Sequence, residues 1–365
     1  MASITATKTQ GGDRRWIVRY RDDTGRSRER WFVRKAEALR YRAQVEVDLS
    51  DGTWIEPSAS NQKAGPWITQ WFEARSNIRP STKTSQEGLL RNHVLPEFGH
   101  KRLASINTSH IDNWIAALGA KGLAPSTIRS VHHLLRSSLE AACRDRLLPR
   151  NPAVGVSLPR DAQREMRVLT PNEVLNLTDC MNQQARCMTL FGALAGLRWG
   201  ETAALRLQSL DLLRRRITVT HTLTQVEGQM VLGPPKTPKS KRSLTIPKRL
   251  VAEIEAHLAT GVKGHDGLIF TTSNGTPLWP RNWRRRIWSP AVAATVGEPL
   301  RYHDLRRTHV AMLIEQGQHP KLIQERLGHS SIRTTLDVYG HLFRGIDEAA
   351  ADAIDVLFPT ARSHA

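Results

Sequence analysis

The stretch GHSSIRTTLDVYGH, residues 328–341, sets one tyrosine between two histidines near the end of the chain. Tyr339 is one of only four tyrosines among 365 residues. A phenol has a pKa of about 10, so near neutral pH it attacks only if a base takes its proton and cations receive the attacked group. His329 and His341 supply polar neighbours of that kind. A buried tyrosine with a hydrogen-bonded hydroxyl is the commoner fate of a single tyrosine, so the stretch alone leaves both interpretations open.

Two further stretches could supply the cations. GALAGLRWGE places Arg198 in an apolar run, with Glu201 three residues later and therefore on the same helical face. RYHDLRRTHV places His303 and Arg306 three residues apart, so a helix stacks them, and one can exchange a proton while the other holds a phosphate. An Arg–Glu pair can equally be structural, and the HxxR spacing is common in basic proteins.

An enzyme that cleaves a phosphodiester bond without a metal also needs an acid that protonates the leaving oxygen. GPPKTPKSKRSLTIP, residues 233–247, places three lysines in a turn rich in Pro and Ser, from which they can reach into a groove. We predict Lys236 as the acid. Lys239 and Lys241 are predicted to touch only backbone phosphates.

The elements that position these residues begin with a small sheet and one helix in residues 1–55. RRWIVRYRDDTGRSRERWFV alternates apolar and polar residues on both sides of a Gly-containing turn, which predicts a β-hairpin. One hairpin face is predicted to carry Trp16, Val18, Tyr20, Trp31 and Val33. A helix follows with its apolar spacing at Ala36, Leu39, Ala43 and Val47.

The rest of the chain divides into two larger blocks. Residues 56–64 and 156–168 are rich in Pro and polar or basic residues and are predicted linkers. Residues 65–155 are predicted to be wholly helical. Residues 169–365 are predicted to be mostly helical with a small antiparallel sheet in 214–247. The predicted fold class is therefore α+β, in several domains.

The charge of the chain predicts a polyanionic partner. Lys and Arg number 53 against 34 Asp and Glu, a net charge of +19. Residues 1–55, 61–160 and 161–365 carry net charges of +4, +8 and +8, so the excess is no basic tail. Three basic segments favour a protein that wraps nucleic acid. Three cysteines without a CxxC spacing predict no disulfide framework, and no apolar run predicts a signal peptide or membrane span.

Five motifs in order complete the sequence argument. They are GLRWGE, the Lys-Thr of the turn, HDLR, LGH and TTLDVYGHL. Together they resemble the signature of the tyrosine recombinase family, in particular the phage-type, lambda-like integrases. The match covers about residues 165–345. Residues 1–55 resemble that family's arm-binding domain, 65–155 its helical core-binding domain, and 169–365 its catalytic domain.

The resemblance implies a role for each motif residue. Its implied catalytic set is Arg198, Lys236, His303, Arg306, His329 and Tyr339. The tyrosine is implied to form a 3′-phosphotyrosine link, the two arginines to clamp the scissile phosphate, and the lysine to protonate the 5′-oxygen. His303 is implied to handle protons and His329 to hydrogen-bond the phosphate. Glu201 is implied to orient its neighbours, and His341 to be structural.

The implied reaction cuts and rejoins double-stranded DNA at attachment sites, with no cofactor, metal or ATP. The resemblance implies a homotetramer on DNA in a bacterial cytoplasm, associated with the nucleoid. It also implies an accessory DNA-bending protein and an excision factor as partners. In GIDEAAADAIDVLF, an apolar face of Ile346, Ala350, Ile354 and Leu357 docks either on a neighbouring subunit or on its own domain. Arg19, Arg21, Arg28 and Arg30 on the hairpin either read arm sites or form solvated strand faces.

Three other functions remain open at this stage. A one-duplex topoisomerase would use the same chemistry without paired sites. A DNA-binding regulator would have lost catalysis, against which the complete motif set argues. A metal-dependent transposase or nuclease would need clustered Asp and Glu side chains, and activity in EDTA would exclude it.

Overall fold

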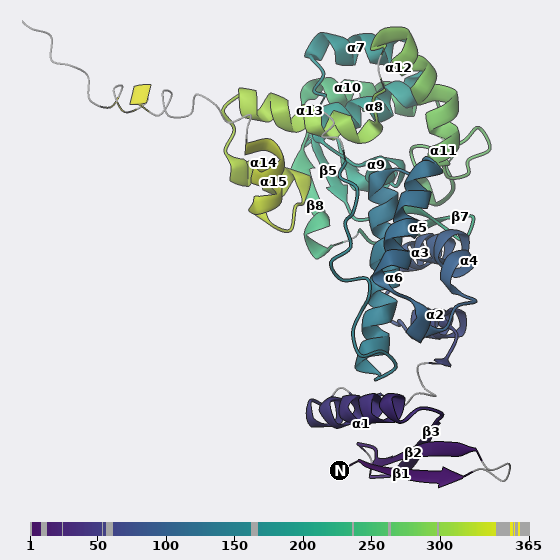
Figure 1. Ribbon diagram of the computed structural model, residues 1–365. Helices are drawn as coiled ribbons and strands as arrows, with labels where there is room; N and C mark the ends of the chain where they lie inside the picture. The colour runs from purple at the N-terminus through teal and green to yellow at the C-terminus, as the bar shows by residue number, and fades with distance from the viewer. Residues whose placement is uncertain are drawn as a thin grey trace, which may run out of the picture. The chain divides into compact units, whose positions relative to one another are not determined.

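The structure is a computed structural model that describes residues 2–8, 13–23, 25–52, 54–55, 61–161, 167–235, 237–261, 264–297 and 299–340, with 351, 352, 354 and 357. The chain divides into two compact units, Met1–Gln163 and Arg164–Ala365 (Figure 1). Each is described by itself. Within the described residues, no helix combines the length and apolar character needed to cross a membrane.

The N-terminal unit starts with a three-stranded antiparallel sheet. Strands β1 (Ser3–Lys8), β2 (Arg14–Arg21) and β3 (Ser27–Phe32) lie in the order β1-β2-β3, and helix α1 (Lys35–Ser50) follows. The predicted hairpin and helix are confirmed. Strand β1 was not predicted; its alternation rests on only two apolar residues, Ile4 and Ala6. Its pairing with β2 runs from Ser3 opposite Arg19 to Lys8 opposite Arg14.

The predicted hairpin face is wrong in β3. Trp16 lies opposite Phe32 in the register, and Ile17 lies opposite Trp31. Residues that pair directly share a face, so Phe32 joins the Trp16 face, and Trp31 points the other way and is 52% exposed. Val33 lies beyond the strand and is also exposed. Because side chains alternate along a strand, the length of the turn decides which set faces inward.

The predicted apolar face of α1 is also wrong. Ala38 and Val45 are buried, whereas Leu39 and Val47 are exposed. The true inward stripe adds the partly buried Tyr41, which packs against the sheet core with Val45. Alanine, leucine and valine occur at both candidate spacings in this helix, so periodicity alone did not select the face.

The block 65–155 was predicted to be wholly helical; it is built of helices up to Arg144, and turns and irregular backbone follow. The helices are α2 (Ala64–Glu73), α3 (Pro80–Leu89), α4 (Leu95–Phe98), α5 (Thr108–Ala120) and α6 (Pro125–Arg144), with a π-helical turn η2 (Leu90–Val94) and a 3₁₀ turn η3 (Leu103–Ser105). Ile68, Leu103 and Ile111 are fully buried in their shared core. The indole of Trp67 donates to the Ser138 carbonyl at 3.0 Å and ties α2 to α6. Helix α3 begins at Pro80, whose fixed φ suits the first helical turn.

The second unit is built from helices around two small sheets. Its helices are α7 (Pro171–Asp179), α8 (Gln183–Ala195), α9 (Trp199–Ala203), α10 (Lys248–Ala259), α11 (Pro280–Trp283), α12 (Ser289–Thr295), α13 (Tyr302–Glu315), α14 (Pro320–Leu327) and α15 (Ile332–Tyr339). Shorter turns are η4 (Leu207–Ser209), η5 (Pro238–Ser240), η6 (His265–Gly267) and the π-helical η7 (Arg284–Trp288).

One small antiparallel sheet was predicted in this unit; the structure has two, both antiparallel. Strands β4 (Leu210–Asp211), β5 (Arg216–Val219) and β8 (Arg242–Thr245) lie in the order β4-β5-β8. Strands β6 (Thr222–Val226) and β7 (Gln229–Gly233) form a separate hairpin. Its turn is the Glu227–Gly228 pair, both with φ in the left-handed region.

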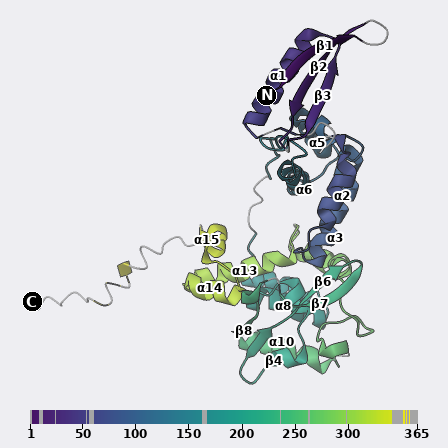
Figure 2. The ribbon, with the colours of Figure 1, turned by 90° about the horizontal axis from the view of Figure 1, so that it is seen from below.

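Helices α8 and α13 lie side by side at the centre of this unit (Figure 2). Gly192 permits the contact, because a Cβ there would lie 2.9 Å from Leu305 Cδ1. The buried Tyr302 hydroxyl donates to the Met188 carbonyl at 2.7 Å. This bond fixes the first turn of α13, which carries the HDLR motif.

Helices α14 and α15 pack on a separate, smaller core. Its buried members are Val310, Ile323, Leu327 and Tyr339. Helix α14 ends at the predicted Gly328, which has φ 66°. Helix α15 is capped by Ser331, whose side chain accepts from the Arg333 N–H.

Candidate active site

Arg198 and Glu201 form the predicted ion pair, but at a break between helices. Helix α8 ends at Gly196 in the left-handed conformation, and Arg198 is the residue that caps α9. The Glu201 carboxylate accepts from the Arg198 backbone N–H at 3.0 Å and from Arg198 Nη1 at 2.7 Å. The Arg198 side chain stays 39% exposed, so its remaining N–H groups can reach a ligand.

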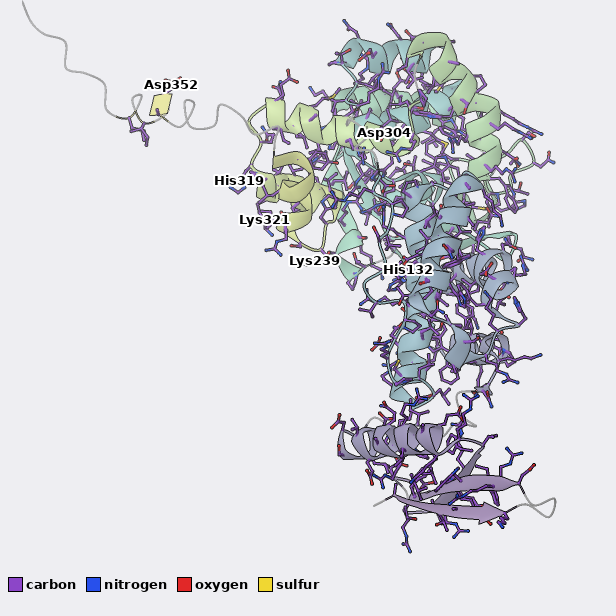
Figure 3. All side chains as sticks on the ribbon, viewed as in Figure 1. His132, Lys239, Asp304, His319, Lys321 and Asp352 are labelled. Carbon is purple, nitrogen blue, oxygen red and sulfur yellow. The ribbon has the colours of Figure 1, made fainter. Side chains whose placement is uncertain are left out.

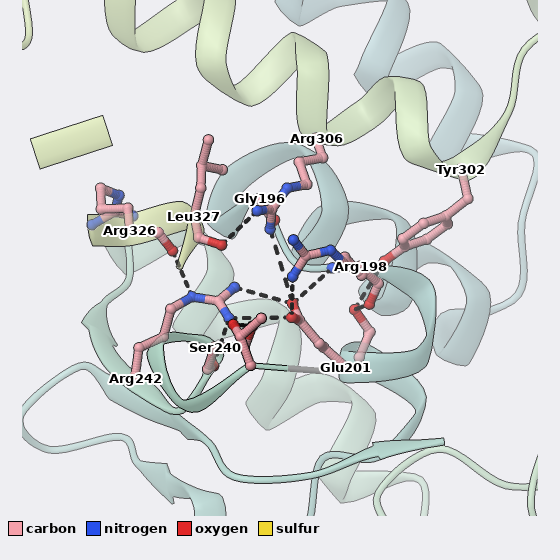
Figure 4. Close-up of polar contacts among 11 residues, drawn as sticks. Gly196, Arg198, Glu201, Ser240, Arg242, Tyr302, Arg306, Arg326 and Leu327 are labelled. Atoms are coloured by element: carbon pink, nitrogen blue, oxygen red, sulfur yellow. Dashed lines mark hydrogen bonds and ion pairs between the residues drawn. The ribbon is translucent and has the colours of Figure 1, made fainter. Parts of the chain in front are cut away.

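The Glu201 carboxylate is the centre of a buried charge cluster (Figure 4). Arg242 approaches it with both terminal nitrogens, Nη1 to Oε1 at 3.2 Å and Nη2 to Oε2 at 3.0 Å. Arg306 Nη1 lies 4.0 Å from Oε2. Burial alone would raise the pKa of Glu201, but the guanidinium groups of Arg242 and Arg198 lower it to about 2. Three arginines around one carboxylate leave two net positive charges at this point.

Arg306 is the most deeply buried member of the cluster. Its side chain is 2% exposed, and its terminal nitrogens donate to the carbonyls of Gly196, at 2.6 Å, and Leu327. Both carbonyls lie at the C-terminal ends of helices, where the helix dipole favours a cation. Burial and Arg198 lower the pKa of Arg306 to about 9, which leaves it cationic near neutral pH.

His303 and His329 lie beside these guanidinium groups. Burial and nearby arginines, Arg306 first, lower the pKa of each histidine to about 4. His303 lies in the first turn of α13, partly covered by its neighbours but still accessible to solvent, and His329 is half-buried in the turn before α15. Both imidazoles are therefore neutral near pH 7 and can accept a proton. The structure brings the two predicted histidines to the same cluster.

Tyr339 ends α15 and is 4% exposed. Burial raises its pKa, and Arg306 and Arg307 oppose that effect. Arg306 therefore acts electrostatically on this phenol, and the role of Tyr339 stays a prediction. A phenol that is protonated at neutral pH needs a base before it can attack.

The lysine turn is only partly described. Lys236 lies outside the described residues. Lys239 Nζ donates to the Ser330 carbonyl at 3.0 Å, and Lys241 is exposed. Lys239 lines a groove of about 470 Å³ together with His329 and Lys321; Lys239 and Lys321 are on the same side of this unit (Figure 3). Two of the three lysines thus lie in a loop next to the cluster.

Arg242 is the functional-site residue that the sequence reasoning missed. Its side chain is 6% exposed and fully engaged in the cluster. A signal was present in strand β8, because alternate residues share a face and Leu244 is buried on the face to which Arg242 belongs. An arginine in phase with buried Leu and Ile predicts a buried partner carboxylate.

The four hairpin arginines do not share one face of the N-terminal sheet. Arg19 and Arg21 lie on one side, where Arg19 pairs with Glu29 at 3.3 Å. Arg28 lies on the other side and pairs with the buried Asp22 at 2.9 Å. On that side Arg30 stacks over Tyr41 at 4.7 Å. A single groove can therefore meet only one of the two pairs directly.

Other predicted residues fall outside this description. His341, Ile346 and Ala350 lie outside the described residues, and Ile354 and Leu357 are exposed. Within the described parts of the chain, no group of three His, Cys, Asp or Glu side chains has the arrangement of a metal site.

Comparison with known proteins decides the family. The phage integrase family model matches residues 167–344, and the model of the phage integrase N-terminal SAM-like domain matches residues 65–119. The ICEBs1 integrase of Bacillus subtilis (strain 168) is 30% identical over 341 residues, which cover 88% of this chain and 90% of that protein. This chain belongs to the phage integrase family. The predicted enzyme class, a site-specific tyrosine recombinase of a phage or mobile element, is confirmed by this membership.

Solved structures show that the fold is that of the phage integrases. The Tn1549 transposon integrase, solved in complex with transposon right end DNA, has a TM-score of 0.69 at 23% identity and covers 80% of this chain and 98% of its own. A lambda integrase tetramer bound to a Holliday junction has a TM-score of 0.57 at 16% identity, covering 89% and 92%. The predicted multidomain α+β class is confirmed.

Proposed function

We propose that this recombinase cuts and rejoins attachment-site DNA through a covalent bond between Tyr339 and a 3′-phosphate. The observation that carries the proposal is the set of three arginines, Arg198, Arg242 and Arg306, around the buried Glu201 carboxylate, with Tyr339 under the electrostatic influence of Arg306. Its two net positive charges match a phosphorane-like transition state with about two negative charges on its oxygens. A phosphodiester carries one such charge, so the cluster stabilises the transition state more than the substrate.

The first step transfers the phosphate to the enzyme. Tyr339 Oη attacks phosphorus while Arg198 and Arg306 donate to the non-bridging oxygens. The phenolic proton passes to His303, whose pKa of about 4 leaves its imidazole free to accept it near pH 7. The bond from phosphorus to the 5′-oxygen breaks, and Lys236 donates a proton to that oxygen. His329 donates a hydrogen bond to the phosphate.

The second step reverses the first on a new strand. A 5′-hydroxyl attacks the phosphotyrosine, its proton returns to the lysine, and the phenolate leaves and recovers a proton from His303. One phosphoester bond is exchanged for another in each step. The reaction therefore needs neither ATP nor a bound metal to supply energy.

We propose double-stranded DNA as the substrate and a homotetramer as the working assembly. The net charge of +19 and the Tn1549 and lambda integrase complexes support both statements. Residues 65–155 are assigned to core-site DNA. A hydroxyl-rich groove between α3 and α6, lined by Ser81, Ser85, Ser126, Ser130 and Arg129, fits a phosphate backbone.

Residues 1–55 are assigned to arm sites. Arg19 and Arg21 lie on the sheet face that carries the exposed Trp31, so this face is the one proposed to meet DNA. Arg28 and Arg30 support the opposite face. Deleting residues 1–55 is expected to spare core-site binding and weaken arm-site binding, measured by gel shift. Unchanged arm binding contradicts the assignment. An accessory bending protein, an excision factor and a nucleoid location complete the proposal.

A suicide substrate nicked near the cut site tests the chemistry. Wild-type protein is expected to form a gel-stable protein–DNA adduct, whereas Tyr339→Phe forms none. Peptide mapping of the adduct should place the linkage at Tyr339. A linkage at any other side chain, or none on a proven site, overturns the proposal. Recombination between two sites then distinguishes an integrase from a one-duplex topoisomerase.

A further inference from the structure

We propose that Arg242 is a positioning residue for leaving-group protonation, holding the loop 237–241 against the turn 328–330. The inference rests on the proposed function, in which the lysine acid directly precedes this loop. Arg242 itself does not touch the phosphate. It acts by fixing the loop to the buried carboxylate that also orients Arg198.

One guanidinium joins three separate parts of the unit. Arg242 Nε donates to the Arg326 carbonyl near the end of α14 at 2.6 Å. Nη1 donates to the Ser240 carbonyl of the loop at 3.1 Å, and Nη1 and Nη2 donate to Glu201. The fork geometry of arginine makes these bonds possible at once, and a lysine ammonium cannot reproduce them.

The loop and the turn touch along their backbones. A Cβ on Gly328 would lie 2.9 Å from the Lys239 carbonyl oxygen and 3.2 Å from Ser240 Cα. Lys239 Nζ donates to the Ser330 carbonyl at 3.0 Å. A hydrogen bond of 2.9 Å between the Thr237 and Ser240 hydroxyls closes the loop on itself. These contacts hold the loop 237–241 against the turn that carries His329.

Because Arg242 is buried, its guanidinium is important for holding the loop in this position. Its side chain is 6% exposed, and that of Glu201 is 3% exposed. Removing the guanidinium takes away the hydrogen bonds that it donates to the carbonyls of Ser240 and Arg326. An unsatisfied buried carbonyl is destabilising, so the loop is expected to move until these groups contact water. Glu201 keeps Arg198 and lies near Arg306, so the phosphate clamp retains its own carboxylate. The loop is then the part most disturbed.

A defect in proton donation can be distinguished from a defect in phosphate binding by replacing the leaving 5′-oxygen with sulfur. An alkoxide is a poor leaving group and needs the acid, which contributes about 10²–10⁴-fold. A 5′-bridging sulfur leaves as a thiolate, whose conjugate acid has a pKa of about 8.5, and needs no proton. A defect in positioning the acid therefore disappears on the sulfur substrate, and a defect in the clamp does not.

The experiment measures single-turnover cleavage of matched 5′-oxygen and 5′-sulfur suicide substrates by the full-length protein. Arg242→Gln is expected to cleave the oxygen substrate about 10²-fold more slowly, at unchanged core-site affinity. On the sulfur substrate its rate is expected to approach that of wild type. Lys236→Ala is expected to behave alike, and Tyr339→Phe to cleave neither substrate. Arg214→Gln, an exposed arginine paired with Asp211 in the same sheet, is the matched control and should cleave both normally.

Two outcomes overturn the proposal for Arg242. An equal loss on both substrates assigns Arg242 to the clamp or to folding, and no loss removes its role. If Arg242→Gln loses cooperative thermal unfolding, Arg242→Lys replaces it and is expected to be about tenfold slower on oxygen alone. Failure of the proposed function looks different, because wild type would then form no adduct at Tyr339 on either substrate.

Discussion

Arg306 and Tyr339 serve the same phosphate in the proposed reaction, yet the protein holds them in different ways. Arg306 lies under the large core of the second unit and is bound by two backbone carbonyls and a carboxylate. Tyr339 is one of the four buried side chains of the smaller core, with Val310, Ile323 and Leu327. Stability is not uniform in such a structure, since few buried contacts allow local opening. The phosphate-binding charge is thus arranged in advance, and the nucleophile is held by the weaker part.

Arg306→Gln removes a charge from the preorganised phosphate site and is expected to lower the cleavage rate more than any other variant that retains Tyr339. Removing one charged donor from a preorganised site costs about 10³-fold in rate, so suicide-substrate cleavage should fall by at least that factor. Core-site affinity should change far less, because many other phosphate contacts remain. Arg301→Gln, an exposed arginine at the start of the same helix, should cleave normally. Near-normal cleavage by Arg306→Gln would erase the contrast with Tyr339.

Glu201→Gln tests whether the arginines depend on their shared carboxylate. Three cations would then lie together without a counter-charge, and breaking a buried pair in this way costs about 3–5 kcal/mol. The free energy of unfolding of the second unit, measured in urea, should fall by that order. Asp211→Asn, which breaks the exposed pair with Arg214, should leave the free energy of unfolding almost unchanged. Equal losses for the two variants would contradict the buried cluster.

Ile323→Val sharpens the comparison from the side of the nucleophile. Loss of one buried methylene should cost about 0.5–1.5 kcal/mol. Hydrogen exchange should speed up in α14 and α15 and stay unchanged in α8. The matched variant Ile254→Val, in the large core, should instead affect amides throughout the unit. If Ile323→Val changes exchange in α8 as well, the two cores open together.

Proton uptake on DNA binding is the smallest expected effect. His303 and His329 have pKa values near 4, below the unfolded value of 6.5, so the unfolded chain binds more protons and stability falls as pH drops through that window. A bound phosphate raises both pKa values. Calorimetry at about pH 5.5 in buffers of different ionisation enthalpy should then show uptake of up to about one proton per histidine. A His303→Gln, His329→Gln double variant should take up none, and release of protons would contradict the assignment.

Sequence patterns predicted the parts of the site that depend on local spacing. Arg198 with Glu201, and His303 with Arg306, follow from separations of three residues. Arg242 was missed because its partners Glu201 and Arg326 lie 41 and 84 residues away. Contacts with partners so far away in the sequence produce no local pattern. The only sign is the alternation of β8, which places Arg242 on the same face as the buried Leu244.

Face assignment failed in the N-terminal sheet for a related reason. The residues of β3 carry apolar side chains at neighbouring positions, and the turn decided that Phe32 rather than Trp31 faces inward. In α1 two apolar stripes competed, and the sheet packed against the one that contains Val45. Packing between elements settles such choices, and a local pattern carries no information about it.

The anchoring of Arg306 by two helix ends has a consequence for sequence change. Its acceptors are main-chain oxygens of Gly196 and Leu327, which no substitution can delete. What must persist is the left-handed stop after each helix, because a Cβ at Gly196 would lie 2.7 Å from His309 and one at Gly328 2.9 Å from Lys239. The surrounding side chains can be substituted, whereas Gly196 and Gly328 are needed to keep the backbone that positions Arg306.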